Sequence, residues 1–189
     1  LRPEQTTSYM VLAQVQIGAN RIADAIATLK QCTAQAPAFP GAYVLLGVLL
    51  DQQKDHAASR AAYEKAIELD PRLPDALNNL AYLLSERFND LDKALELAQR
   101  ARDAQPANPA IADTIGWLLY KKKQYARAVT LLEESAGKLP QSGEARYHLG
   151  MAQYMSGNEG AARTALQEAL ALEASFPGSD DARQSLALL

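Results

Sequence analysis

Five prolines recur at an almost constant interval along the chain. The distances between Pro3, Pro37, Pro71, Pro106 and Pro140 are 34, 34, 35 and 34 residues. A fixed period of this length is typical of repeat proteins, in which each repeat is one small structural unit that packs on its neighbours. Of all the features of this sequence of 189 residues, the period therefore constrains the fold most strongly.

Other positions follow the same period when the chain is aligned on these prolines. A large apolar column consists of Leu12, Leu46, Leu80, Ile115 and Leu149, and the small column next to it consists of Ala13, Gly47, Ala81, Gly116 and Gly150. Three later columns are Ala25, Ser59, Ala94, Ala128 and Ala162, then Leu29, Tyr63, Ala98, Leu132 and Leu166, and then Cys32, Ala66, Ala101, Ser135 and Ala169. Because small residues let helices approach and large apolar residues fill the space between them, the columns predict closely packed helix pairs.

The prolines also predict where the helices begin and end. Proline removes a backbone donor and disfavours helix in the preceding residue, so the recurring prolines follow the second helix of each pair. Pro40, Pro74 and Pro109 stand where the next helix begins, a position that suits proline. The expected first helices are 6–18, 41–52, 75–87, 109–122 and 143–156, and the expected second helices are 22–35, 57–69, 91–104, 125–137 and 159–173. The third repeat has one extra residue, which we expect in its turn near 88–90.

The composition agrees with an all-α protein. Ala and Leu supply 64 of the 189 residues, whereas Val, Ile and Thr together supply 18. A β-rich fold normally uses more β-branched residues. The length is sufficient for a buried core, either in one globular domain or in one repeat array.

The repeated pattern resembles that of the tetratricopeptide repeat (TPR) family over residues 6–176. The runs GWLLYKKKQYARAVTLLEESAGKLP at 116–140 and LGMAQYMSGNEGAARTALQEALAL at 149–172 are similar to the family pattern. Ser59, Ala98 and Ala174 depart from the residues usual at their positions. The resemblance implies an all-α, right-handed superhelical solenoid of about five helix-turn-helix repeats plus a C-terminal capping helix.

This resemblance divides the chain into segments. The expected repeats cover residues 6–39, 40–73, 74–108, 109–142 and 143–176, preceded by the tail of another repeat at 1–5 and followed by a solvating helix at 177–189. Because Pro3 occupies a closing position, we expect the chain to be the C-terminal part of a longer array. Ser179 or Asp180 is expected to cap the final helix.

The family resemblance also implies a binding surface, because the first helix of each TPR lines a concave groove. The inward positions of the last three repeats hold several aromatic and polar residues, which offer large contact area and hydrogen-bonding groups. The candidate partner-binding residues are Asn78, Tyr82, Asp113, Trp117, Tyr120, Tyr147, Met151 and Tyr154. A purely structural role in packing between repeats is an equal alternative for Tyr120 and Tyr154.

A known TPR subclass clamps a C-terminal carboxylate with Lys, Asn and Arg at set positions. Here Asn79 fits one of these positions, but Val44, Val48, Ala110 and Thr114 occupy others. The carboxylate clamp is therefore absent, which argues against a chaperone-adaptor role.

Residues suited to catalysis or metal binding are few. Cys32 lies in a column of small packing residues, His56 lies in an expected turn, and His148 is expected to form a solvated surface pair with Glu144. One cysteine excludes an internal disulfide and a Cys-cluster zinc site. We therefore expect neither enzyme activity nor a metal or cofactor.

The charge pattern and hydropathy exclude other classes. The net charge is −3, with both signs intermixed, which argues against nucleic-acid binding. The sequence has no apolar run of the roughly 18 residues that a membrane span needs, so we expect no membrane insertion.

The predicted function is a non-catalytic scaffold or adaptor that binds a protein or peptide in the concave groove. The last repeats resemble those of large bacterial TPR proteins of exopolysaccharide export and protein-sorting systems, which implies a periplasmic or envelope-associated assembly role. A cytoplasmic location stays open. Two alternatives also stay open: a self-associating scaffold, and the regulatory arm of an enzyme whose catalytic domain lies upstream.

Overall fold

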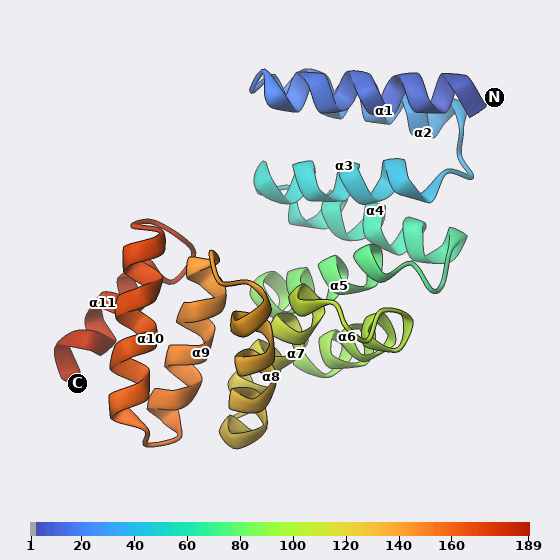
Figure 1. The fold of residues 1–189 in the computed structure, drawn as a ribbon. Coiled ribbons are helices and arrows are strands. Elements are labelled where there is room, and N and C mark those ends of the chain that lie inside the picture. Colours follow the sequence, from blue (N-terminus) through green and yellow to red (C-terminus); the bar gives the residue numbers. More distant parts are fainter. Residues whose placement is uncertain (1–2) are drawn as a thin grey trace. The chain divides into compact units, whose positions relative to one another are not determined.

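The computed structural model describes residues 3–189, with side chains described from Thr6 onward. This part of the chain is all-α: it forms eleven α-helices and one π-helical turn, and contains no strand. It divides into two compact units, Leu1–Asp90 and Leu91–Leu189. Each unit is built from antiparallel helix pairs (Figure 1), and the predicted all-α repeat architecture is confirmed.

The helices of the first unit are α1 (Pro3–Gly18), α2 (Ile22–Gln35), α3 (Pro40–Gln52), α4 (His56–Leu69), α5 (Pro74–Leu83) and the π-helical turn η1 (Leu84–Phe88). Those of the second unit are α6 (Leu91–Ala104), α7 (Pro109–Lys121), α8 (Tyr125–Lys138), α9 (Gly143–Met155), α10 (Glu159–Leu172) and α11 (Ser179–Leu188). The predicted bounds agree within a residue or so, except that α1 begins earlier and η1 replaces the last turn expected after α5.

The turns within the helix pairs share one backbone conformation. Asn20, Lys54, Asn89, Lys123 and Gly157 all have a positive φ, between 53° and 81°. Four of these turns are closed by a backbone hydrogen bond between residues five apart. An example is the bond that the Asp55 amide donates to the Leu50 carbonyl, at 2.9 Å. Such a left-handed residue commonly ends a helix, because it turns the chain and satisfies the last carbonyls.

The extra residue of the third repeat lies in this turn, as predicted, but its effect extends into the helix. The residues Leu84–Phe88 adopt a π-helical turn, and Asn89 takes the left-handed conformation. The closing bond then joins residues six apart, from the Asp90 amide to the Leu84 carbonyl, at 3.1 Å. A π-helical turn accommodates one inserted residue without ending the helix.

The small column lets the two helices of a pair approach closely. A Cβ added at Gly47 would lie 2.6 Å from the Tyr63 ring, and one at Gly116 would lie 2.6 Å from Cγ of Leu132. The same addition at Gly150 would lie 2.7 Å from Cγ of Leu166. These distances are shorter than carbon atoms tolerate, so glycine is required for the close approach in α3·α4, α7·α8 and α9·α10.

Two polar residues inside the helix pairs of the first unit are hydrogen-bonded within the same pair. The hydroxyl of Ser59 donates to the Gly47 carbonyl at 2.8 Å, which accounts for serine in a column otherwise held by alanine. The hydroxyl of Thr28 donates to Oε1 of Gln16 at 2.8 Å. Cys32 is fully buried in the core of the first unit, so its predicted packing role is confirmed.

The C-terminal helix α11 packs against both α10 and α9 (Figure 1). Its N-cap is Gly178 in the left-handed conformation, so the prediction of Ser179 or Asp180 as the cap was wrong. A Cβ at this glycine would lie 2.3 Å from the Tyr147 ring. The tyrosine therefore needs glycine here, because the turn must pass directly over its ring.

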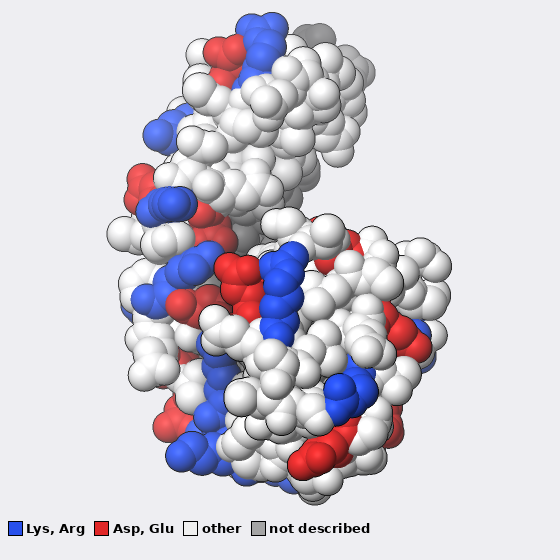
Figure 2. Space-filling model, turned by 90° about the vertical axis from the view of Figure 1, so that its left-hand side faces the viewer, with Lys and Arg blue, Asp and Glu red and all other residues white. Residues whose placement is uncertain are grey.

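Charges of both signs are interspersed on the face shown in Figure 2, as the composition predicts. Among the described residues, none of the helices has the length and apolar character of a membrane span.

Candidate functional site

The second unit brings six predicted groove residues onto neighbouring helices. Asp113, Trp117 and Tyr120 lie on α7, and Tyr147, Met151 and Tyr154 lie on α9, with the same spacing of four and three residues. Residues at this spacing share one face of a helix. The two helices are in contact, so we call these six residues the first-helix face.

Trp117 is the centre of an aromatic stack on this face. Its ring lies nearly parallel to Tyr120, with centroids 4.6 Å apart, and to the imidazole of His148, with centroids 4.2 Å apart. The ring of Tyr147 is tilted against the indole, with centroids 5.7 Å apart. The ammonium of Lys121 lies 5.9 Å from the centroid of the Trp117 ring. Much of the indole is thus engaged within the protein, which gives Trp117 a packing role between the fourth and fifth repeats.

His148 is the residue whose environment differs most from the expectation. It is 3% exposed, and its Nδ1 lies 2.8 Å from Oδ2 of Asp113. The hydroxyl of Ser135 donates to the other carboxylate oxygen of Asp113 at 3.5 Å. The predicted solvated surface environment of His148 was therefore wrong, because the imidazole is buried against the Asp113 carboxylate of α7, which Ser135 of α8 also contacts.

The C-terminal segment covers part of the first-helix face. Tyr147 is 3% exposed. Its ring packs on the ring of Phe176, with centroids 5.5 Å apart. Its hydroxyl donates a hydrogen bond to Oδ2 of Asp181 at 3.4 Å. The hydroxyl of Ser185 on α11 contacts the sulfur of Met151 at 3.5 Å. Contact of Tyr147 and Met151 with a partner stays a prediction, and it would require access beside or beneath α11.

The remaining predicted residues are partly accessible. Asp113, Trp117, Tyr120, Met151 and Tyr154 are all half-buried. In the first unit, Asn78 and Tyr82 lie four residues apart on α5 and are also half-buried. Burial, together with nearby Tyr125 and Asp181, raises the pKa of the Tyr120 phenol. The phenol is therefore a neutral hydrogen-bonding group at physiological pH.

The contacts of three residues with this face were missed by sequence reasoning: those of His148, Phe176 and Asp181. The contact between His148 and Asp113 could have been predicted, because these residues are one repeat plus one residue apart in the sequence. Residues at that separation occupy adjacent positions on successive first helices. The contacts of Phe176 and Asp181 have no comparable signal, because the turn after α10 departs from the repeat.

The described residues contain no group of three or more His, Cys, Asp or Glu side chains that could hold a metal ion. The arrangement of the first-helix face is suited to contact and hydrogen bonding. Burial raises the pKa of the Cys32 thiol, which disfavours a reactive thiolate.

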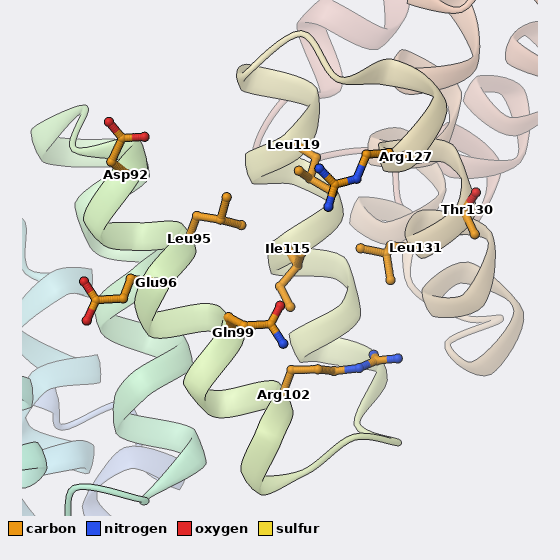
Figure 3. A pocket seen from close by; sticks show the side chains of 10 residues that line it. All are labelled: Asp92, Leu95, Glu96, Gln99, Arg102, Ile115, Leu119, Arg127, Thr130 and Leu131. Carbon is orange, nitrogen blue, oxygen red and sulfur yellow. The ribbon is translucent and has the colours of Figure 1, made fainter.

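A separate groove opens on the other side of α7. Its volume is about 710 Å³, and its floor is formed by Ile115 and Leu119 of α7. Leu95 of α6 and Leu131 of α8 line its two walls (Figure 3). We call it the α6–α8 groove. The remaining lining residues are Asp92, Glu96, Gln99, Arg102, Arg127 and Thr130.

Ion pairs occupy both ends of the α6–α8 groove. At one end, Asp92 pairs with Lys122, and this contact lowers the pKa of the Asp92 carboxyl. At the other end, Arg102 pairs with Glu134 at 2.8 Å. Hydrogen bonds from Arg102 and then from Lys138 lower the pKa of the Glu134 carboxyl. The groove is therefore bounded along its length and is apolar in its middle.

Antiparallel helix pairs, repeated at a fixed period with close-packed glycines and exposed grooves, define a helical-repeat scaffold for protein–protein interaction. The chain belongs to the tetratricopeptide repeat family. A tetratricopeptide repeat model matches residues 10–74 and 114–180, and a second such model matches residues 62–96. Proteins of this family generally act as non-catalytic scaffolds that bind proteins or peptides.

One curated relative is the TPR repeat-containing protein PA4667 of Pseudomonas aeruginosa, which is 31% identical over 103 residues. That match covers 54% of this chain and 17% of the relative, so the chain spans about a sixth of that protein's length.

Solved structures show the same fold at low sequence identity. PilW, described as a widely conserved type IV pilus biogenesis factor, has a TM-score of 0.81 at 17% identity, covering 96% of this chain and 86% of PilW. YrrB, described as a TPR protein with an unusual peptide-binding site, has a TM-score of 0.65 at 18% identity, covering 93% of this chain and 90% of YrrB.

Proposed function

We propose that this scaffold binds a peptide or helix of a protein partner through its first helices. In the second unit the contact surface is the first-helix face, and in the first unit it includes Asn78 and Tyr82 of α5. The observation that carries the proposal is the partial exposure of Tyr120 and Tyr154 on adjacent first helices. Aromatic and thioether side chains provide apolar contact area at such surfaces.

The packing of this face favours a preformed binding surface. Trp117 fixes the position of Tyr120 through their parallel stack at 4.6 Å. Asp113 is held by His148 at 2.8 Å. Side chains that are already ordered lose less conformational entropy when a partner binds. A partner therefore meets the edge of the aromatic stack and the exposed parts of Tyr120 and Tyr154.

Affinity capture from source-cell extract tests this proposal. The wild-type chain is compared with the triple variant Tyr82→Ala/Tyr120→Ala/Tyr154→Ala, after both show the same helicity by circular dichroism. We expect a partner that the wild-type chain retains and the variant loses. A double variant Val11→Gln/Val15→Gln, which removes exposed apolar side chains of α1, is the control. Equal retention by all three chains would refute the proposal.

We further propose that the partner belongs to a bacterial envelope or protein-sorting assembly. This rests on the resemblance of the last repeats to proteins of those systems, and on a fold like that of the pilus biogenesis factor PilW. Identification of the captured partner tests it: a cytoplasmic metabolic enzyme as the reproducible partner would contradict it.

A further inference from the structure

We propose that the α6–α8 groove is a second docking site, and that its occupant is a short acidic segment of a protein partner carrying leucine-like side chains. This site goes beyond the binding proposed for the first-helix face. The position of the groove, its apolar middle and the charge of Arg127 that points into it favour this occupant.

The two surfaces lie on opposite sides of α7. Successive residues of an α-helix are about 100° apart around the axis, so Trp117 lies about 200° from Ile115. Ile115 and Leu119 form the floor of the groove, whereas Trp117 belongs to the first-helix face. An occupant of the groove would therefore not compete directly for the first-helix face.

The shape of the groove limits the occupant to a short segment. The ion pairs Asp92–Lys122 and Arg102–Glu134 stand at its two ends. The residues from Asp92 to Arg102 span about 15 Å along α6, at about 1.5 Å per helical residue. Between them, the leucine and isoleucine side chains at 95, 115, 119 and 131 offer an apolar surface. One or two aliphatic side chains on about ten residues of helix would fill it.

The charges favour an acidic occupant. The guanidinium of Arg127 points from α8 into the groove over Leu119 (Figure 3). Its one hydrogen bond within the described chain is to the neutral amide oxygen of Gln124, at 2.6 Å. Arg102, in contrast, is already paired with Glu134 at 2.8 Å. The exposed guanidinium of Arg127, whose partner is a neutral amide, is therefore the group suited to a carboxylate of the occupant.

The acidic side chains of the groove do not cancel this preference. Asp92 is paired with Lys122, and Glu96 points from α6 away from the middle of the groove (Figure 3). The carboxylates of an occupant would thus approach Arg127 without a carboxylate of the protein directly between them.

A set of matched peptides tests the proposal. Each is a fluorescein-labelled, alanine-based helix of about ten residues with leucines at positions 4 and 8. The three peptides differ in carrying Glu, Gln or Lys at the flanking positions. Binding to the full chain is measured by fluorescence anisotropy. We expect the Glu peptide to bind about tenfold more tightly than the Gln peptide, and the Lys peptide to bind most weakly.

Substitutions then locate the binding. Arg127→Gln should weaken the Glu peptide about tenfold while leaving the Gln peptide unchanged. Arg163→Gln is the matched control, because it removes an exposed cation from α10 outside the groove. Leu131→Ala should weaken both peptides, whereas Tyr120→Ala/Tyr154→Ala should weaken neither. That last variant separates this site from the first-helix face.

Several results would overturn the proposal. These are the absence of binding to the wild-type chain, equal binding of the Glu and Lys peptides, and an equal effect of Arg127→Gln and Arg163→Gln. Analytical ultracentrifugation provides a further check. A concentration-dependent mass that Arg127→Gln abolishes would identify a second copy of the chain as the occupant instead.

Discussion

Substitution of Gly116 by alanine tests the close approach of α7 and α8. The added Cβ would lie 2.6 Å from Cγ and 2.8 Å from Cδ2 of Leu132, which is fully buried. Overpacking of this kind costs about 1–3 kcal/mol. Replacing glycine by alanine inside a helix returns roughly 0.5–1 kcal/mol. We therefore expect Gly116→Ala to lower the free energy of unfolding by about 1–2 kcal/mol.

The same substitution in a chain that also carries Leu132→Ala tests whether the clash with Leu132 is the cause. Alanine in the small column occurs with alanine in the third repeat (Ala81 and Ala98) and with leucine in the first (Ala13 and Leu29). In the fourth repeat the added Cβ would meet Leu132 itself, so a smaller residue at position 132 would make room for alanine at 116. In a Leu132→Ala chain, we expect Gly116→Ala to become stabilising, by roughly 0.5–1 kcal/mol. The four chains form a double-mutant cycle, measured by urea unfolding followed by circular dichroism at 222 nm.

The control is Gly137→Ala on α8, where an added Cβ meets no atom within 4 Å. This change should be neutral or slightly stabilising. If Gly116→Ala is equally destabilising with leucine and with alanine at position 132, steric contact between the two side chains is not the cause. A stabilising effect in the wild-type background would refute the close approach itself.

Three further predictions concern single buried or strained positions. Lys54→Gly should stabilise the chain by roughly 0.5–1 kcal/mol in urea unfolding, because φ at this residue is 62°. Gln153→Leu should stabilise it by about 1 kcal/mol, because Oε1 is buried with no hydrogen-bond partner among the described residues; Gln16→Leu should instead destabilise it, because the Thr28 hydroxyl loses its 2.8 Å bond. Burial raises the pKa of Cys32, so its thiol should react with a disulfide reagent only on unfolding, and stability should fall as pH rises above about 8.5.

For each of these three predictions, one experimental result would contradict the physical reason given. Destabilisation by Lys54→Gly would mean that the lysine side chain contributes more than the backbone conformation costs. Equal effects of the two glutamine substitutions would show that hydrogen bonding does not distinguish the two sites. Rapid labelling of the thiol in the folded chain, or a pH dependence unchanged in Cys32→Ala, would contradict the buried environment.

The aromatic residues show how far sequence reasoning reached at the candidate site. The repeat positions correctly indicated that Asp113, Trp117 and Tyr120 share a face of one helix, because that relation depends only on helical spacing. The same positions do not reveal that Trp117 stacks on His148 at 4.2 Å. Side-chain stacking depends on rotamers and on the distance between neighbouring helices, and neither is encoded in the spacing of one residue type.

The C-terminal segment shows that the exposure of the first-helix face could not be predicted from the repeat pattern either. A final helix was expected, and α11 is present, with Ser179, Ala182 and Ser185 as its buried residues. Its contact with Tyr147 and Met151 depends on the turn through Gly178, whose φ is 95°. A single turn outside the repeat directs the helix over the first-helix face, so the repeat pattern could not predict which residues it covers.

The repeat period, the helix bounds and the close-packed columns could all be read from the order of the amino acids. These follow from local helix signals and from equivalent positions one period apart, which neighbouring repeats bring together. Which faces remain accessible became known only from the packing of the helices against one another. The stack around Trp117, the Asp113–His148 contact and the α6–α8 groove each depend on side chains of several helices at once. Exposure is a property of the packed assembly, because each side chain's access to solvent depends on every neighbour that lies over it.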